Sequence, residues 1–233
     1  MRPKAKPSND PNHNEKKLAK IGRAVTDHLN ENPYIQLVEA EGAQIYVYQN
    51  FLAADDCKTL IQLIDQDAQP STLYKGTEVE KFRTSFSCNL DRFDSDVARI
   101  EQKICETLGI NADKAETMQG QRYAVGQEFK PHHDFFHIAE PYWKLEGPNG
   151  GQRSWTAMIF LNEPEEGGET GFRDLGVTVL PRTAMLLLWN NMNLDGTANY
   201  LSLHSGNPVL RGTKYIITKW FRQDKWLGHE VHQ

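Results

Sequence analysis

The chain has 233 residues, of which 39% are hydrophobic and 24% charged, and its formal net charge is −5 at pH 7. This composition is typical of a globular protein with one domain or a small pair, and it lacks both the long apolar run of a membrane span and the apolar stretch of a secretory signal. Three widely spaced cysteines, Cys57, Cys88 and Cys105, fit neither a disulfide framework nor a thiolate zinc site. They favour a reducing, cytoplasmic location.

The charge is distributed unevenly along the chain. Residues 1–23 contain seven basic and two acidic side chains, so the rest of the chain is strongly acidic. Nucleic-acid binding depends on Lys and Arg contacts to phosphates, and an acidic body therefore disfavours nucleic acid as a partner. We interpret residues 1–16, which are polar and contain three prolines, as a disordered basic tail.

Apolar residues at helical spacing predict three helices. The first lies within 17–33, which we assign as an N-terminal helix and linker. The second is expected at about 54–66. The third is expected at about 95–108 and ends at Gly109, a residue suited to the left-handed conformation of a helix C-terminus.

Most of the remaining chain has the pattern of short strands separated by turns rich in Gly, Pro and Asn. Residues 34–233 are therefore expected to form one domain that is mainly β with flanking helices, as a sandwich or jelly roll. The strands are expected at 34–38, 44–49, 83–90, 117–125, 154–162, 183–189 and 213–222.

A possible metal site is formed by two histidines and a carboxylate. His132 and Asp134 lie two residues apart, so on an extended segment both project from the same face, while His133 points the other way. His204 is the best third ligand, because it is the only histidine inside the strand-rich region after residue 137. Such a set occupies three positions of an octahedral Fe(II) and leaves the others open. From the residues alone, a hydrogen-bonded core histidine with ordinary turn residues is the alternative.

The strand expected at 214–222 adds a second feature. With the side-chain period of two, Lys214, Thr218 and Trp220 share one face, while the opposite face is mostly apolar and is expected to pack against helices. A buried cation needs a partner, and a bound dicarboxylate would supply one.

Several motifs follow one another in a fixed order. Residues 123–136 read Tyr-Ala-Val-Gly-Gln-Glu-Phe-Lys-Pro-His-His-Asp-Phe-Phe; Gly-Gly-Gln-Arg follows at 150–153, then Glu-Gly-Gly-Glu-Thr at 166–170, His204 and Lys214. Over residues 45–224 the chain thus resembles the prolyl 4-hydroxylase branch of the Fe(II)/2-oxoglutarate-dependent oxygenases. That family has the motif Tyr-x-x-Gly-x-x-Tyr-x-x-His-x-Asp-x-Phe.

The resemblance implies a bacterial-type enzyme with a single catalytic domain, built on a double-stranded β-helix, or jelly roll. It implies three groups of site residues. Fe(II) would be held by His132, Asp134 and His204; 2-oxoglutarate would be bound by Lys214, Tyr123 and Thr218; the substrate would be contacted by Arg153, Trp220 and Phe129.

The implied activity is hydroxylation of a peptidyl residue, in the first place proline, with O2 as oxidant, ascorbate as reductant, and succinate and CO2 as products. The implied partner is a proline-containing peptide or protein, and no association with a membrane is expected. Phe129 departs from the family, which usually has a tyrosine there whose hydroxyl contacts the target proline. Two alternatives therefore remain: the same chemistry on another protein side chain or a small molecule, and, more weakly, a non-catalytic jelly-roll binding protein.

Overall fold

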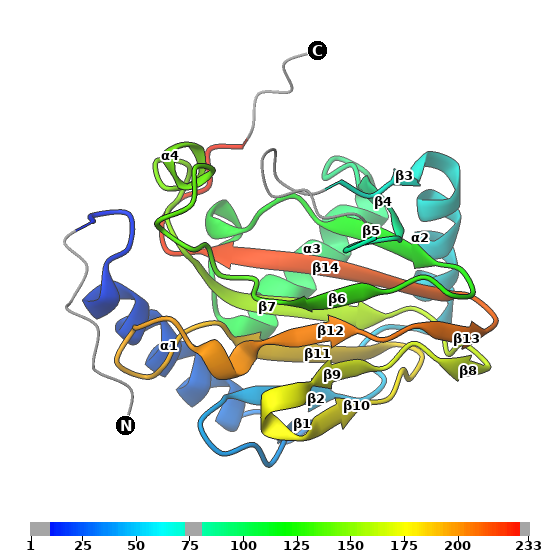
Figure 1. Ribbon diagram of the computed structural model, residues 1–233, viewed down its shortest axis with the longest axis horizontal. Helices are drawn as coiled ribbons and strands as arrows, with labels where there is room; N and C mark the ends of the chain where they lie inside the picture. Colours follow the sequence, from blue (N-terminus) through cyan, green and yellow to red (C-terminus); the bar gives the residue numbers. More distant parts are fainter. Residues whose placement is uncertain (1–9, 73–80, 229–233) are drawn as a thin grey trace.

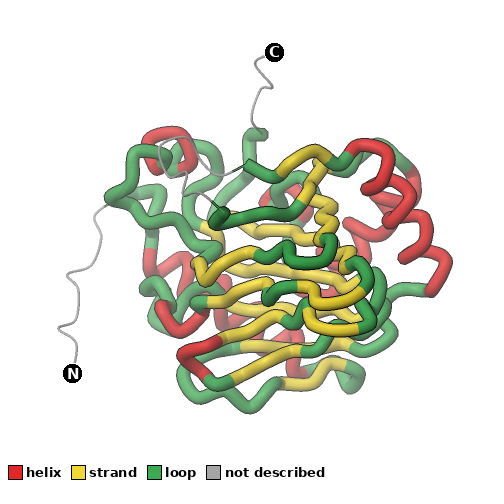
Figure 2. The backbone as a smooth tube through the Cα atoms, turned by 45° about the vertical axis from the view of Figure 1, so that its right-hand side comes forward, coloured by secondary structure: helices red, strands yellow, loops and turns green. Residues whose placement is uncertain are grey.

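The structure is a computed structural model that describes residues 10–72 and 81–228. Its strands gather in the middle of the molecule, with the longer helices outside them (Figures 1 and 2). The larger sheet has eight strands. In spatial order they are β1 (Ile35–Leu37), β2 (Ile45–Tyr48), β11 (Met185–Asn190), β7 (Arg153–Phe160), β14 (Lys214–Arg222), β5 (Gln119–Tyr123), β4 (Phe86–Asn89) and β3 (Gln69–Pro70).

A second, smaller sheet lies in front of the larger one in Figure 1. It has four strands in the order β10 (Val177–Val179), β9 (Thr170–Phe172), β12 (His204–Gly206) and β6 (Phe129–His132), and β8 (Glu166–Gly167) pairs with β13 (Val209–Arg211). None of these six strands is among those predicted, because segments of two to four residues are too short to show a period of two. The prediction of a mainly β chain with flanking helices is confirmed.

Three helices cover the face of the larger sheet that points away from the smaller one. They are α1 (Glu15–Asn30), α2 (Ala54–Asp67) and α3 (Ser95–Leu108), as predicted apart from the start of α1. The Asp94 carboxylate accepts hydrogen bonds from two amides in the first turn of α3, and Gly109 ends this helix at φ 64°. The short helices are α4 (Trp143–Glu146), η1 (Ala112–Lys114), η2 (Arg173–Leu175) and η3 (Tyr200–Ser202). Among the described residues, no helix is long and apolar enough to cross a membrane.

The apolar interior has two parts, one on each side of the larger sheet. Ile217 and Phe221 of β14 pack among the residues of the helices, whereas Ile216 lies in the cluster between the two sheets. The two faces of β14 therefore separate as the period of two predicts. The same alternation places Lys214 and Thr218 in the space between the sheets, where the functional site is found.

The prediction of a disordered tail through residue 16 is wrong for residues 10–16. The His13 amide donates to the carbonyl of Asp10 (3.0 Å) in a turn, and α1 begins at Glu15, where the Asn14 side chain accepts from the Lys17 amide (3.1 Å). His13 is buried. Polar composition suggested disorder, but these polar groups find fixed partners on the folded body. Residues 1–9, the rest of that tail, lie outside the described residues.

Candidate active site

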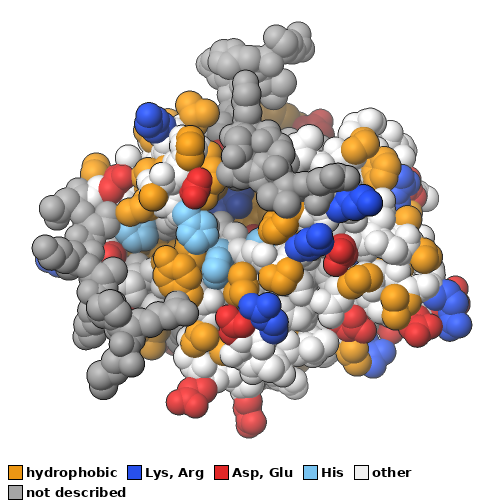
Figure 3. Space-filling view, viewed as in Figure 1, with side chains coloured by type: hydrophobic (Ala, Val, Ile, Leu, Met, Phe, Trp, Pro, Cys, Tyr) orange, Lys and Arg blue, Asp and Glu red, His pale blue; other side chains and the backbone are white. Residues whose placement is uncertain are grey.

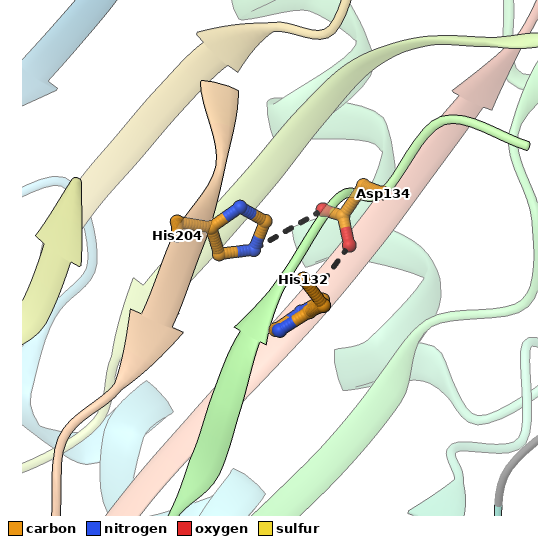
Figure 4. Close-up of side chains that lie close together, drawn as sticks. All are labelled: His132, Asp134 and His204. Carbon is orange, nitrogen blue, oxygen red and sulfur yellow. Dashed lines mark ion pairs between the residues drawn. The ribbon is translucent and has the colours of Figure 1, made fainter. Parts of the chain in front are cut away.

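The smaller sheet brings His132, Asp134 and His204 together (Figure 4). His132 and His204 are register partners on the antiparallel strands β6 and β12, and Asp134 follows the end of β6. Their Nε2 atoms lie 3.7 Å and 3.8 Å from the two Asp134 carboxylate oxygens. Within residues 10–72 and 81–228 these three form the group whose ligand atoms could hold a metal ion, all within 4.8 Å of one another. His133 contacts the Tyr200 carbonyl instead, outside this group.

Both imidazoles are oriented by their other ring nitrogen. Nδ1 of His132 lies 2.8 Å from the carbonyl of Lys130, and Nδ1 of His204 lies 2.9 Å from the carbonyl of Ser202. A carbonyl can only accept, so each Nδ1 donates in this hydrogen bond and each Nε2 is the ring nitrogen that faces the centre. Burial and the neighbouring His204 lower the pKa of His132 to about 3, so this imidazole is neutral at pH 7.

The Asp134 carboxylate is held by a hydrogen-bonded relay. The hydroxyl of Thr156 donates to Oδ2 (2.8 Å), and the Asn191 amide donates to that hydroxyl (2.9 Å). Burial alone would raise the pKa of Asp134, but the two imidazoles, Arg153 and this hydroxyl outweigh it and lower the pKa. The centre therefore consists of two imidazoles and one carboxylate, which is the donor set that suits a non-haem Fe(II) with open positions.

A cavity between the two sheets adjoins this centre. Its empty volume, including the open mouth, is about 380 Å³. Lys214 is 1% exposed and makes no ion pair with any described residue, and burial lowers its pKa from the ordinary 10.5 to about 7. Nearby, the Tyr123 hydroxyl donates to the Gln121 side chain (2.8 Å), whose amide donates to the Thr218 hydroxyl (3.0 Å). An anionic ligand fits this lining, since it would supply the missing partner of the lysine.

Sequence reasoning missed several residues that line this cavity, among them Gln121 and Thr170. The Thr170 hydroxyl is buried and has no hydrogen-bond partner in the part of the chain that the structure describes, so it is available to a ligand in the cavity. The sequence contained a feature that could have assigned each of these two residues to the site. Gln121 precedes Tyr123 by two residues on one strand face, and Thr170 ends the Glu-Gly-Gly-Glu-Thr motif.

Comparison with known proteins decides the family. The model of the 2OG-Fe(II) oxygenase superfamily matches residues 118–222. The chain is 35% identical to "Probable prolyl 4-hydroxylase 3" of Arabidopsis thaliana over 199 residues, which cover 75% of this chain and 68% of that protein. It is 32% identical to "Prolyl 4-hydroxylase 5" of the same plant, with 82% and 72% covered. The chain belongs to the prolyl 4-hydroxylase family of 2-oxoglutarate- and Fe(II)-dependent oxygenases.

Solved structures show the same fold. A viral collagen prolyl hydroxylase from Paramecium bursaria Chlorella virus-1, in complex with 2-oxoglutarate, has a TM-score of 0.60 and 24% identity, with 82% of this chain and 97% of that chain covered. A prolyl 4-hydroxylase of Pseudomonas putida has a TM-score of 0.52 and 19% identity, with 88% and 98% covered. The predicted double-stranded β-helix is confirmed.

The protein is thus a dioxygenase that uses Fe(II), 2-oxoglutarate and O2. The residues present fit these groups: the three ligand atoms lie within 4.8 Å of one another, and the neighbouring cavity offers a buried lysine that makes no ion pair with any described residue. Figure 3 shows histidine side chains beside hydrophobic ones on the face seen in Figure 1.

The three residues expected to contact the substrate of this oxygenase lie near one another. Phe129 and Trp220 line the cavity, and Phe129 stacks on the His132 ring with 3.6 Å between centroids. The Arg153 guanidinium lies 4.2 Å from the centre of the Trp220 ring and donates two hydrogen bonds to the Glu116 carboxylate (2.6 and 2.7 Å). Arg153 is therefore fixed in place by a structural ion pair.

Proposed function

We propose that this oxygenase hydroxylates a proline residue within a peptide or protein chain. The observation that carries the proposal is the Trp220 indole, which lines the cavity while its buried N–H has no acceptor among the described residues. Such a donor suits a peptide carbonyl. Proline itself brings no backbone N–H and presents an apolar ring, which suits the aromatic side chains of Phe129 and Trp220 in the cavity lining. The similarity to prolyl 4-hydroxylases supports the same substrate class.

In this proposal the site residues have separate tasks. The metal ligands are His132, Asp134 and His204. Lys214 would pair with a carboxylate of 2-oxoglutarate, and Tyr123, Thr218 and Thr170, which line the same cavity, would offer their hydroxyls to it. When bound, Fe(II), 2-oxoglutarate and O2 would supply the oxidising chemistry, in which one oxygen atom of O2 enters the succinate formed together with CO2 and the other enters the hydroxyl group of the product.

The protein's own contribution is to orient and to shield. Thr156 and the two backbone carbonyls behind the imidazoles fix the donor atoms, so the centre is arranged before any ligand arrives. The rings of Phe129 and Trp189 pack on the imidazoles and keep water from their faces. Arg153, held by Glu116, keeps the Trp220 ring in one position at the substrate side.

One observation favours a second candidate, in which the same chemistry acts on another protein side chain or a small molecule. Phe129 has no hydroxyl, so it cannot make the hydrogen bond that the family's usual tyrosine makes to the proline. Such a bond contributes about 0.5–1.5 kcal/mol, which is too little to decide the substrate class by itself.

The test is conversion of 2-oxoglutarate to succinate, followed by NMR, with Fe(II) and ascorbate. Each reaction is run with proline-containing peptides, with the same peptides carrying alanine for proline, and without peptide; the His132→Ala variant is the control. Succinate that increases only with proline peptides, together with a peptide mass gain of one oxygen, supports the proposal. Turnover that is the same with proline and alanine peptides would favour the second candidate.

We further propose a cytoplasmic location. All three cysteines are free thiols, and Cys57 and Cys105 are buried. Free thiols are usual in a reducing compartment. Fractionation of cells that express the tagged chain would test this location, and recovery of the chain outside the cytoplasm would contradict it.

A further inference from the structure

Residues 10–14, the N-terminal strap (dark blue in Figure 1), contact α4 and the segment just before β7. The Trp143 indole donates to the Asp10 carboxylate (2.6 Å), and the backbone N–H of Gln152 donates to the carbonyl of Asn12 (3.1 Å). At its end the Asn14 amide donates to the Gln223 side chain (2.7 Å). The strap is thus joined to three other segments of the chain, each more than a hundred residues away in sequence.

The strap reaches the active site through Gln152. This side chain is fully buried and binds both backbone groups of Phe136: its oxygen accepts from the amide (2.6 Å) and its nitrogen donates to the carbonyl (2.8 Å). The same nitrogen lies 3.2 Å from Nδ1 of the buried His13. We call the pair of bonds between Gln152 and Phe136 the amide clamp. Phe136 follows Asp134 by two residues, and its ring lies under the Arg153 guanidinium at 4.7 Å.

The backbone of the strap approaches the backbone at Gly151 closely. Gly151 has φ 72°, and a methyl group added there would lie 2.7 Å from the carbonyl oxygen of Asn12. Only glycine satisfies both the positive φ and this approach. The strap therefore packs closely against the backbone at Gly151 and does not merely lie on the surface.

We propose that the N-terminal strap is a positioning element for the substrate side of the active site. It holds Gln152, Gln152 holds Phe136 through the amide clamp, and Phe136 supports the Arg153 guanidinium against Trp220. This proposal rests on the proposed function, because it assigns the strap to peptide binding. Of the cosubstrate residues, Tyr123 lies on β5, while Lys214 and Thr218 lie on β14, nine and five residues before Gln223, where the strap is bound.

Loss of the strap is expected to change the KM for the peptide but not the KM for 2-oxoglutarate. Without the strap the amide clamp loosens, so the KM for the peptide is expected to rise about tenfold or more, because small displacements of positioning groups have large kinetic effects. The KM for 2-oxoglutarate and the slow turnover without peptide are expected to stay within about twofold of the full chain. A strap that served only stability would change both constants together or neither.

The experiment compares two deletions and one substitution in the full chain. Deletion of residues 1–13 removes most of the strap but keeps Asn14, which caps α1. Deletion of residues 1–9 removes only the residues before the strap. Asp10→Ala removes the acceptor of the Trp143 indole from an otherwise complete chain, which guards against misfolding of the longer deletion. The peptide KM is expected to rise in the longer deletion and in Asp10→Ala, and to stay unchanged in the shorter deletion. An equal peptide KM in all three variants overturns the proposal.

Hydrogen exchange of the metal-free protein gives a readout that needs no substrate. The backbone amides of Phe136 and Gln152 are expected to lose protection in the longer deletion and to keep it in the shorter one. Unchanged protection of both amides in the longer deletion overturns the proposal, whatever the peptide assays give. If no peptide stimulates the full chain, the proposed function fails, and the exchange data still decide whether the strap holds the clamp.

Discussion

The Thr156 hydroxyl, on β7 of the larger sheet, donates a hydrogen bond of 2.8 Å to the carboxylate of Asp134, a residue that follows β6 of the smaller sheet. This bond fixes one metal-binding carboxylate across the space between the sheets. We predict that Thr156→Val, which keeps the side-chain shape, weakens Fe(II) binding about 10–100-fold, as loss of a group that orients a ligand usually does. Anaerobic titration with Fe(II) measures this change.

Thr156→Ser is the matched control for that prediction, because it keeps the hydroxyl and loses only a methyl group. Its Fe(II) affinity is expected to stay within a few-fold of the wild type. If Thr156→Val bound Fe(II) as tightly as Thr156→Ser, the relay through Asn191 and Thr156 would have no part in orienting the carboxylate.

A second prediction concerns pH and Lys214, whose pKa burial lowers from 10.5 to about 7. The dianionic cosubstrate binds the protonated lysine. Below pH 7 the lysine is already charged, and above pH 7 its protonated fraction falls about tenfold per unit. The Kd for 2-oxoglutarate is therefore expected to be level below pH 7 and to rise with pH above it. Binding at pH 8 is expected to take up a proton, which calorimetry in buffers of different ionisation enthalpy detects.

Lys214→Arg separates this effect from other titrations. The guanidinium stays charged throughout, so the Kd of the variant is expected to be nearly independent of pH between 7 and 9, even if its fork geometry weakens binding overall. A pH profile of the same slope in both proteins would assign the titration to another group.

The third prediction addresses the substrate side. Arg153 and Glu116 form a two-bond pair in which each side chain is only 11% exposed, and the guanidinium packs on Trp220. Arg153→Lys keeps the charge but loses the fork and the stacking, so we expect a stability loss of about 1.5–3 kcal/mol and a higher peptide KM. Arg182→Lys, in the exposed pair with Glu163, is the control and is expected to change stability by less than about 1 kcal/mol. Equal denaturation midpoints for the two variants would refute this argument.

The parts of the fold that the sequence predicted are those with several repeats of one period. The helices α2 and α3 and the nine-residue β14 show their apolar faces over three or more turns or alternations. The metal ligands were found for a chemical reason: His132 and Asp134 share a face at a spacing of two, and few other histidines were left to complete the set. The lysine without a partner followed from the same alternation along β14.

The parts that could not be predicted depend on contacts between distant segments. The smaller sheet consists of strands of three or four residues, too short for a period, although two of them bear His132 and His204. Thr156 and Asn191 acquire their roles only when β7 and β11 pair. The strap was misread because its polar composition says nothing of partners at Trp143 or Gln152, which lie over 130 residues away.

The fourth prediction tests the packing that supports β5, the strand of Tyr123 and Gln121. Gly120 faces α2, and a methyl group there would lie well inside van der Waals contact of Ile64, which is fully buried. Gly120→Ala is expected to destabilise the protein by about 1–3 kcal/mol through overpacking, and to lower Tm by about 2–4 °C for each kcal/mol. Ile64→Ala alone leaves a cavity, but in the double variant the new methyl group fills part of it. The double variant is therefore expected to lose less stability than the sum of the single variants, and additive losses in a double-mutant cycle would show that the two side chains do not meet.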